Sequence, residues 1–234
     1  MKPNRKQHCF EDIRTGILTM EIAPGADLDE TALSEAYGMS RTPFREVLQR
    51  LAGEGYLQLS ENRGAKVASM DLAVMRSFFQ TAPLIYSSIA RLAAENSTTE
   101  QLDALKEIQR NFSAAVEADR SEDMALHNHR FHEQIGHMAA NDYLTASLNR
   151  LLMDHTRLGQ TFYRPASDQE RGAVTKACQQ HDAMIAAFEA RDSAVATDLT
   201  LQHWELSRDW LERFVRPDPL PIDVVDFSEK RHAV

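Results

Sequence analysis

From Asp71 to about residue 215 the chain shows helical periods and no strand signals, and this restricts its fold more than any other feature. Apolar residues recur at helical spacing, and candidate capping residues separate the periods. The pattern predicts helices near residues 71–95, 98–119, 121–139, 142–162, 168–190 and 192–215. Their candidate starts are Thr98 or Thr99, Ser121, Asn141, Ser167 and Asp192. Helices of this length bury their apolar sides against one another, so we expect a helical bundle.

The first seventy residues contain shorter elements separated by turn signals. An apolar face including Phe10 predicts one helix, and Asp29 is a good N-cap for a second. Ser40 is expected to cap a third helix through the N–H of Thr42. The segment Leu57–Val67 then alternates around a turn, which predicts a two-stranded wing.

The change of pattern near residue 70 divides the chain. We expect a mainly α protein with a winged helix–turn–helix at residues 1–70, which carries a small β wing, and an all-α bundle at 71–215. Three prolines shortly after residue 216 exclude a helix, so an extended C-terminal tail is expected at 216–234.

Composition indicates the class of protein and the cellular compartment in which it is found. Of the 234 residues, 43% are apolar and 26% are charged, as in globular proteins. No apolar run approaches the roughly 20 residues that span a bilayer, and the basic start resembles no signal peptide. Cys9 and Cys178 lie too far apart in sequence for a metal knuckle. We expect a cytoplasmic protein with no membrane partner.

The net charge of −9 is distributed unevenly along the chain. Residues 1–70 carry a net charge of −1, whereas residues 71–234 carry −8. Within the first part, residues 40–66 hold five basic and three acidic side chains. This local excess of positive charge suits a polyanion, although an ordinary solvated surface has the same composition.

The third helix of the first part separates two faces. Arg41, Arg45 and Gln49 are spaced four residues apart, so they share a side opposite the apolar residues. An arginine near a helix N-terminus can bind guanine in the major groove, while Thr42 and backbone N–H groups hold phosphate. Arginines that are merely solvated, with Glu46 as an ion-pair partner, remain the alternative from this pattern alone.

This N-terminal part resembles the winged helix–turn–helix of GntR-family transcription regulators. The resemblance rests on the segments MSRTPFREVLQRL (residues 39–51), EGYL (54–57) and NRGAKV (62–67). A helical second part of this length resembles the FCD domain of the FadR subfamily. The resemblance implies a homodimer that binds double-stranded DNA at a pseudo-palindromic operator under the control of a small-molecule effector, and we expect a repressor. Its DNA contacts would be Arg41, Thr42, Arg45 and Gln49, with Arg63 and Gly64 at the wing tip.

Seven of the nine histidines lie between residues 127 and 203. Helical phase places Asn128 and His132 on or beside one buried face, and His181 and His203 on two further apolar stripes. Imidazoles from facing helices of a bundle are typical of a metal site. Histidines satisfied within the core remain the alternative. The others in this region, His127, His129, His137 and His155, are expected at the surface or at helix ends.

The resemblance to FCD domains favours the metal site. Asn128, His132, His181 and His203 look like the Asp-x-x-Phe-His, His and His positions that hold a divalent metal in that family. The chain departs from the pattern at Asn128, because a neutral amide replaces the usual carboxylate and is a weaker ligand. Three imidazoles suit Zn²⁺ or Ni²⁺ and leave positions open for water or an effector carboxylate.

The effector site departs from the family as well. Metal-containing members use an arginine and a glutamate of the first bundle helix for an acidic ligand, and Ala82 and Tyr86 occupy those places here. An organic acid would then need another cation, which is Arg157, Arg150 or the metal itself. We expect the effector-binding residues to be Tyr86, Arg150 and Arg157.

A different class of protein fits part of the sequence. A metal-dependent all-α enzyme, or a small-molecule-binding protein with an N-terminal interaction domain, also fits the histidines. The segment His132–His137 nearly matches the HExxH motif of zinc proteases. Its second histidine comes five residues after the first, which turns the two rings away from each other on a helix. We therefore expect a regulator and no enzyme.

Overall fold

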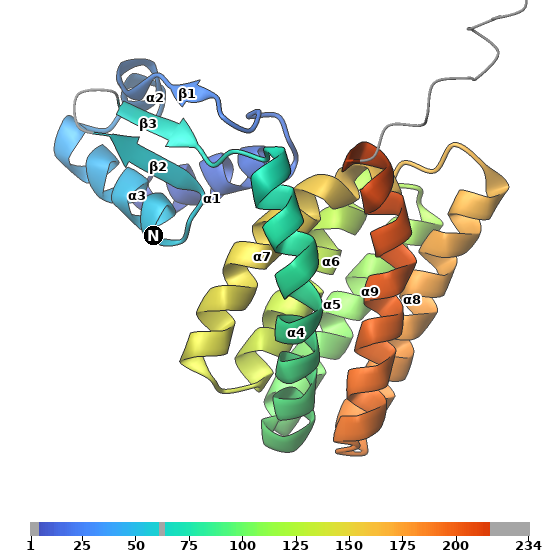
Figure 1. The fold of residues 1–234 in the computed structure, drawn as a ribbon. Coiled ribbons are helices and arrows are strands. Elements are labelled where there is room, and N and C mark those ends of the chain that lie inside the picture. The colour runs from blue at the N-terminus through green and yellow to red at the C-terminus, as the bar shows by residue number, and fades with distance from the viewer. Residues whose placement is uncertain (1–4, 61–63, 216–234) are drawn as a thin grey trace, which may run out of the picture.

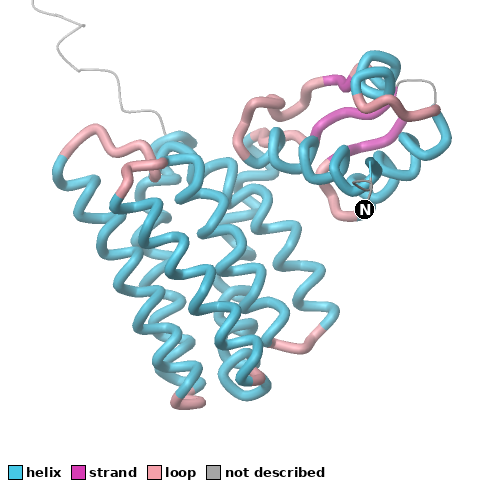
Figure 2. The backbone as a smooth tube through the Cα atoms, turned by 180° about the vertical axis from the view of Figure 1, so that it is seen from behind, coloured by secondary structure: helices cyan, strands magenta, loops and turns pink. Residues whose placement is uncertain are grey.

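The computed structural model describes residues 5–60 and 64–215. They form a winged helix–turn–helix and, beside it, a bundle of six helices (Figure 1). The view from behind shows that strands are confined to the winged part (Figure 2). The expected mainly helical fold class is confirmed, and the tail at 216–234 lies outside the described residues.

The winged part begins with the helices α1 (Arg5–Leu18), α2 (Glu30–Ala36) and α3 (Arg41–Gly53). Asp29 caps α2 by accepting hydrogen bonds from two backbone N–H groups at 3.0 and 2.9 Å. Ser40 is the N-cap of α3, but its side chain makes no capping hydrogen bond, so the expected bond is wrong. Pro43 at the third helical position has no N–H, which leaves a cap at Ser40 fewer donors to bind.

The sheet of the winged part has three strands and not the expected two. Strands β2 (Leu57–Ser60) and β3 (Gly64–Val67) form the expected antiparallel pair. A short strand β1 (Asp27–Leu28) adds to β3 on its other edge, which gives the order β1-β3-β2. Two residues are too few to show the alternation from which strands are recognised. The turn at residues 61–63 lies outside the described part of the chain.

The bundle consists of the helices α4 (Leu72–Asn96), α5 (Thr99–Glu117), α6 (Ser121–Met138), α7 (Asp142–Phe162), α8 (Asp168–Glu189) and α9 (Ser193–Val215). All six begin and end within two residues of the expected bounds. Thr98 forms a capping box, and Asn141, Ser167 and Asp192 accept hydrogen bonds from the first turns that follow them. Ser121 is the first helical residue and not the cap.

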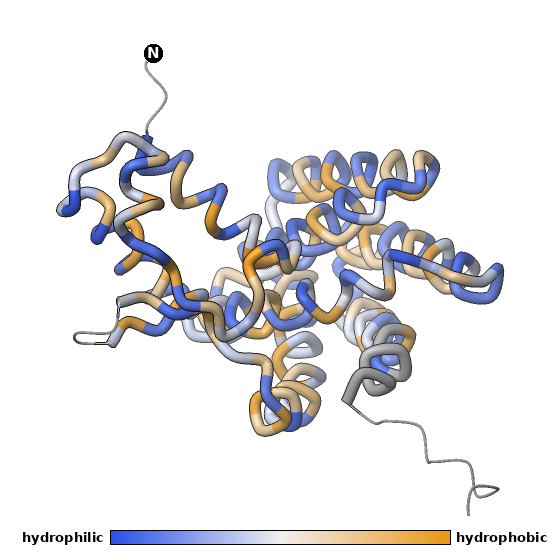
Figure 3. The backbone as a smooth tube through the Cα atoms, turned by 90° about the horizontal axis from the view of Figure 1, so that it is seen from above, coloured by the Kyte–Doolittle hydropathy of each residue, from blue (hydrophilic) through white to orange (hydrophobic). Residues whose placement is uncertain are grey.

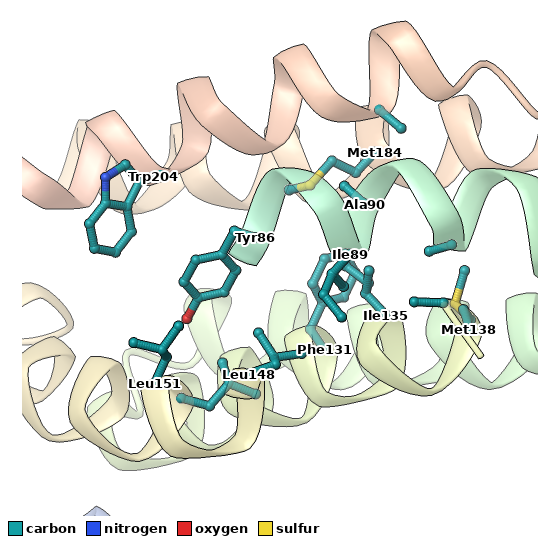
Figure 4. Close-up of a cluster of buried hydrophobic side chains, with 14 of the residues drawn as sticks. Tyr86, Ile89, Ala90, Phe131, Ile135, Met138, Leu148, Leu151, Met184 and Trp204 are labelled. Carbon is teal, nitrogen blue, oxygen red and sulfur yellow. The ribbon is translucent and has the colours of Figure 1, made fainter. Parts of the chain in front are cut away.

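Helix α4 lies in the middle of the bundle and packs against α6, α7 and α9. Figure 3 shows hydrophilic and hydrophobic residues alternating along the helices, as amphipathic helices require. The apolar sides form two buried clusters, and Figure 4 shows part of the larger one between α4, α6, α7 and the C-terminal pair of helices. No helix of the described residues is both long and apolar enough to cross a membrane.

The winged part is packed directly onto α7. Met153 of α7 is fully buried in the core of the winged part, where its neighbours include Phe44 and Leu48. The amide of Gln160, two turns further along α7, donates a hydrogen bond of 3.0 Å to the carbonyl of Leu18. The same helix therefore belongs to the core of the bundle and to that of the winged part.

Candidate functional site

The exposed side of α3 carries the polar residues that the sequence assigns to DNA. Phe44, Val47, Leu48 and Leu51 are buried on the other side of the helix. Arg41, Thr42, Arg45 and Gln49 are exposed. Glu46 pairs with Lys6 of α1 and not with either arginine, which weakens the ion-pair alternative.

A surface groove runs between α2 and α3. Arg41, Arg45 and Gln49 line it on one side, and Thr31 and Ser34 of α2 line it on the other. Helix–turn–helix proteins place this second helix in the major groove of DNA. Gly64 begins β3 with a φ of +75°, a left-handed conformation that suits glycine. Arg63 lies outside the described residues.

Inside the bundle, three histidines from three helices meet. His132 of α6, His181 of α8 and His203 of α9 place one ring nitrogen each within 4.8 Å of the others. The ring centroids of His181 and His203 are 4.7 Å apart, and that of His132 lies 5.6 Å from His181 and 5.3 Å from His203. All three are buried. Helical phase turns each of these side chains inward, as the sequence indicates, and the packing of α6, α8 and α9 brings them together.

Hydrogen bonds fix the orientation of two of these rings. His181 Nδ1–H donates to Gln109 Oε1 at 3.0 Å, and His203 Nδ1–H donates to Gln180 Oε1 at 3.1 Å. The amide of Gln109 is itself oriented, because its Nε2 donates to Asp182 at 3.0 Å. A neutral imidazole with its proton on Nδ1 carries its lone pair on Nε2. Both Nε2 atoms are thus ready to accept a proton or a cation.

Three buried polar atoms on α6 and α8 have no hydrogen-bond partner in the described chain. They are Nε2 of His132, Nε2 of His181 and Oδ1 of Asn128. Unpartnered buried acceptors are costly, and a bound cation satisfies several of them at once. The residues present therefore fit a divalent metal ion, with outer hydrogen bonds of the kind that orient metal-binding histidines.

The imidazoles are held in their neutral form. Burial lowers the pKa of His203 to about 3, and the nearby His155 adds to this shift. The pKa values of His132 and His181 lie well below the usual range, first because of burial and then because of the neighbouring imidazoles. Neutral imidazoles are the form that binds metal.

A fourth histidine, His155 of α7, lies beside this triad. Its ring is 5.9 Å from that of His132, and its Nδ1 is 2.8 Å from the hydroxyl of Tyr86. Tyr86, a predicted effector-binding residue, is 5.6 Å from His132 between ring centroids. Figure 4 shows Tyr86 of α4 between Trp204 and Leu151. Burial lowers the pKa of His155 to about 4.

A second unexpected histidine, His129, joins the bundle to the winged part. Arg14 of α1 donates to its Nε2 at 2.9 Å and to Glu133 at 2.7 Å, and its Nε donates to Tyr56 at 3.0 Å. Because arginine only donates, Nε2 of His129 is the acceptor, and its Nδ1–H donates to Thr156 at 2.8 Å. His129 lies one turn from His132 on the same helix.

The expectation that His129 and His155 lie at the surface or at helix ends is wrong. Only 3% of His129 and 6% of His155 is exposed. The signal was present in the sequence: His155 is in phase with the stripe that contains Leu151 and Leu158, and His129 is in phase with Ala125. Helical phase therefore predicts the burial of these residues, although it does not predict their hydrogen bonds.

Arg150 and Arg157 are not brought to the triad. Arg157 is fully buried, pairs with Asp154 and donates to the carbonyl of Ala68 at 2.8 Å. Arg150 donates to the carbonyl of Gly55. Both guanidinium groups therefore bind backbone of the winged part or of the segment that follows it, and their role in effector binding stays a prediction.

Comparison with known proteins shows to which class this protein belongs. Residues 5–67 match the model of the bacterial regulatory proteins of the gntR family, and residues 79–206 match the FCD domain. The chain therefore belongs to the GntR family of transcription regulators, in the branch with an FCD domain, and the family resemblance seen in the sequence is confirmed. It is a DNA-binding regulator and not an enzyme.

Individual proteins agree with this assignment. The HTH-type transcriptional repressor RspR of Escherichia coli (strain K12) is 25% identical over 197 residues, which cover 84% of each chain. A transcriptional regulator of Streptomyces ambofaciens is 46% identical over 72 residues, or 31% of this chain and 30% of its own length. The structure of E. coli McbR/YncC has the same fold, with a TM-score of 0.75 at 20% identity, covering 91% of this chain and 99% of its own.

The buried neutral histidines make the metal-free protein sensitive to acid. Unfolded histidine has a pKa near about 6.5, above the folded values, so the unfolded state binds more protons as pH falls. From about pH 7 to about pH 5 we expect each such histidine to remove about 2 kcal/mol from the free energy of unfolding. His155→Gln should lessen this loss by one histidine's share in urea titrations, and His137→Gln, at an exposed position, should not. Equal losses in all three proteins would contradict the assignment.

Proposed function

We propose that α3 reads an operator in the major groove, with Arg41, Arg45 and Gln49 at base edges. Thr42 and the first N–H groups of α3 would hold phosphate, and Arg63 and Gly64 at the wing tip would contact the adjacent backbone or minor groove. The observation that carries this proposal is the exposed, unpaired side of α3 facing the groove between α2 and α3. The acidic bundle lies away from this face, which agrees with the charge distribution along the sequence.

Arg41→Ala and Arg45→Ala should each weaken specific operator binding by about 1 to 3 kcal/mol and relax the base preference. The reason is the loss of a forked guanidinium at a base edge. Fluorescence anisotropy with operator and scrambled duplexes measures both effects, and Arg110→Ala, an exposed arginine of α5, serves as the control. If both α3 variants discriminate like the unchanged protein, another surface reads the DNA.

We further propose that the protein acts as a homodimer through the outer side of α4 and α7, here called the α4–α7 face. Two large apolar side chains are exposed on it: 67% of Leu84 and 90% of Tyr143. A groove of about 550 Å³ between the two helices adds Phe78 and Ile85 to this apolar surface. One recognition helix reads too few base pairs to select a site alone, so two copies on a pseudo-palindrome suit such a regulator.

Leu84→Glu should convert the dimer to a monomer, because a carboxylate would be buried without a partner at the centre of the interface. Light scattering over a concentration series measures the mass, and Val195→Glu on α9 is the control for an exposed apolar residue outside this face. A Leu84→Glu protein that stays dimeric would place the interface elsewhere.

We infer that His132, His181 and His203 hold one divalent metal ion, Zn²⁺ or Ni²⁺, with Asn128 as a weak fourth donor. The support is the set of unpartnered nitrogen and oxygen atoms at this point and the outer hydrogen bonds from Gln109 and Gln180. When bound, the ion would supply a positive charge and a rigid cross-link between α6, α8 and α9.

Asn128→Asp should tighten Zn²⁺ or Ni²⁺ binding by about tenfold or more, because it adds a charged ligand. His181→Ala should abolish the rise in melting temperature that the metal produces, a stabilisation of about 2.7 kcal/mol at a hundredfold excess over Kd. His137→Ala, on the exposed side of α6, should keep the full rise. Elemental analysis and melting curves measure these effects. A wild-type protein that contains no metal, and whose melting temperature does not change with Zn²⁺ or Ni²⁺, would exclude the site.

We infer that the state of this site controls operator binding, and that the protein is a repressor, as the related RspR is named. Helix α6 carries His132 at the triad and His129 at Arg14, one turn apart. Helix α7 carries His155 beside the triad and Arg157 on the segment that leaves the winged part. A shift of either helix therefore moves groups that hold the DNA-reading part. An organic acid as the effector stays a prediction.

A further inference from the structure

A groove on the outer side of the bundle is separate from the histidine triad. Helices α4 and α7 pack against each other (Figure 1), and a groove of about 550 Å³ runs between them. Sites for small molecules typically have volumes of about 300 to 1,000 Å³. The described residues that line this groove include none of the three triad histidines. A ligand in the groove would therefore bind independently of that site.

Much of the groove is apolar. Phe78 and Ile85 of α4 and Leu151 of α7 line it. Such a surface suits the apolar body of a small molecule. Leu84 and Tyr143, the exposed residues of the proposed dimer contact, do not line the groove. A second copy bound at these two residues can therefore leave the space between the helices free.

Two charged side chains also line the groove, Arg150 and Asp154. Asp154 is buried and pairs with Arg157, which is fully buried as well. Arg150 has no carboxylate partner among the described residues. Its Nη1 donates to the carbonyl of Gly55 and lies 3.8 Å from Sδ of Met153. The two guanidinium groups and one carboxylate therefore leave a net charge of +1, which suits a monoanion.

Contacts with the winged part hold the side chain of Arg150 in place. A Cβ atom at Gly55 would lie 2.9 Å from Cδ of Arg150, so the arginine stem packs directly against this glycine. The bond to the Gly55 carbonyl uses only Nη1. A guanidinium group carries five N–H donors in one plane and binds carboxylates through two parallel bonds. Nε and Nη2 of Arg150 are therefore available for the two oxygens of a carboxylate.

We propose that this groove binds a small amphipathic acid, with its carboxylate on Arg150 and its apolar body against Phe78, Ile85 and Leu151. The positive charge selects a monoanion, and the apolar lining selects an uncharged body. Arg150 also binds Gly55 in the turn that follows α3, so the acid would act directly on the DNA-reading part. This inference deepens the proposed regulation by giving an acidic effector its own site, and it rests on neither the metal site nor the dimer.

Octanoate is a suitable probe, because it has one carboxylate and a short apolar chain. Isothermal titration calorimetry should give a Kd below about 1 mM for the wild-type protein. Octan-1-ol and octylammonium have no negative charge and should bind at least about tenfold more weakly. EDTA should leave octanoate binding intact, because no triad histidine lines the groove. Equal binding of the three probes, or loss of octanoate binding in EDTA, would overturn the inference.

Variants locate the site. Arg150→Met should weaken octanoate binding at least about tenfold, whereas Arg76→Met, at an exposed position of α4 outside the groove, should not. Because Arg150 also contacts the winged part, a second variant leaves it in place. Thr81→Trp fills the groove and should weaken binding similarly, and Gln80→Trp, at the exposed neighbouring position, should bind like the wild type. Unchanged binding in both Arg150→Met and Thr81→Trp would overturn the inference.

The Leu84→Glu variant separates the acid from a second copy of the chain as the occupant of the groove. Octanoate should bind this variant and the wild-type protein with the same Kd. If octanoate binds the variant and not the wild type, a second copy fills the groove and the inference is overturned. A variant with the same mass as the wild type would refute the proposed dimer contact, and octanoate should then still bind both proteins.

Discussion

Among the contacts that hold the winged part against the bundle, the guanidinium group of Arg14 joins three side chains at once. Arg14 of α1 reaches into the bundle and binds His129, Glu133 and the hydroxyl of Tyr56. Hydrogen bonds that involve a charged group each contribute about 1.5 to 3 kcal/mol. Arg14 also keeps His129 neutral, because burial and its positive charge together lower the pKa of His129 to about 3. A DNA-reading part tethered by a free linker would have no such fixed orientation.

Because of these contacts, helices α6 and α7 each have two roles: they carry residues of the histidine site and they contact the winged part. Each helix has one side toward the triad and another toward the winged part. On each helix, a histidine at or beside the triad therefore lies about one turn from a residue that contacts the winged part or the segment after it. In the proposed regulation, ligand binding at His132 would act on Arg14 through a single helix. Coupling of this kind requires that a packed helix can adopt two arrangements. A change from one to the other would break polar contacts such as those of Arg14 and Arg157 and form new ones.

Most of the fold was predictable because it depends on local signals. The bundle helices follow from their period and caps, and helical phase turns His132, His181 and His203 inward, whereas their meeting at one point was implied only by the resemblance to FCD domains. Strand β1 was not predictable, since two residues show no alternation. The partners of Arg150 and Arg157 were not predictable either, because a basic residue on a helix contains no information on which distant carbonyl it binds. Helical phase was sufficient to predict the burial of His129 and His155.

Hydrogen exchange with and without Zn²⁺ or Ni²⁺ tests the central claim that the site and the DNA-reading part are coupled through α6 and α7. The claim predicts that the cation changes the protection of backbone amides around His132 and, in the same titration, of those in α1 near Arg14 and at residues 68–69. A change confined to the amides around the three histidines would contradict it.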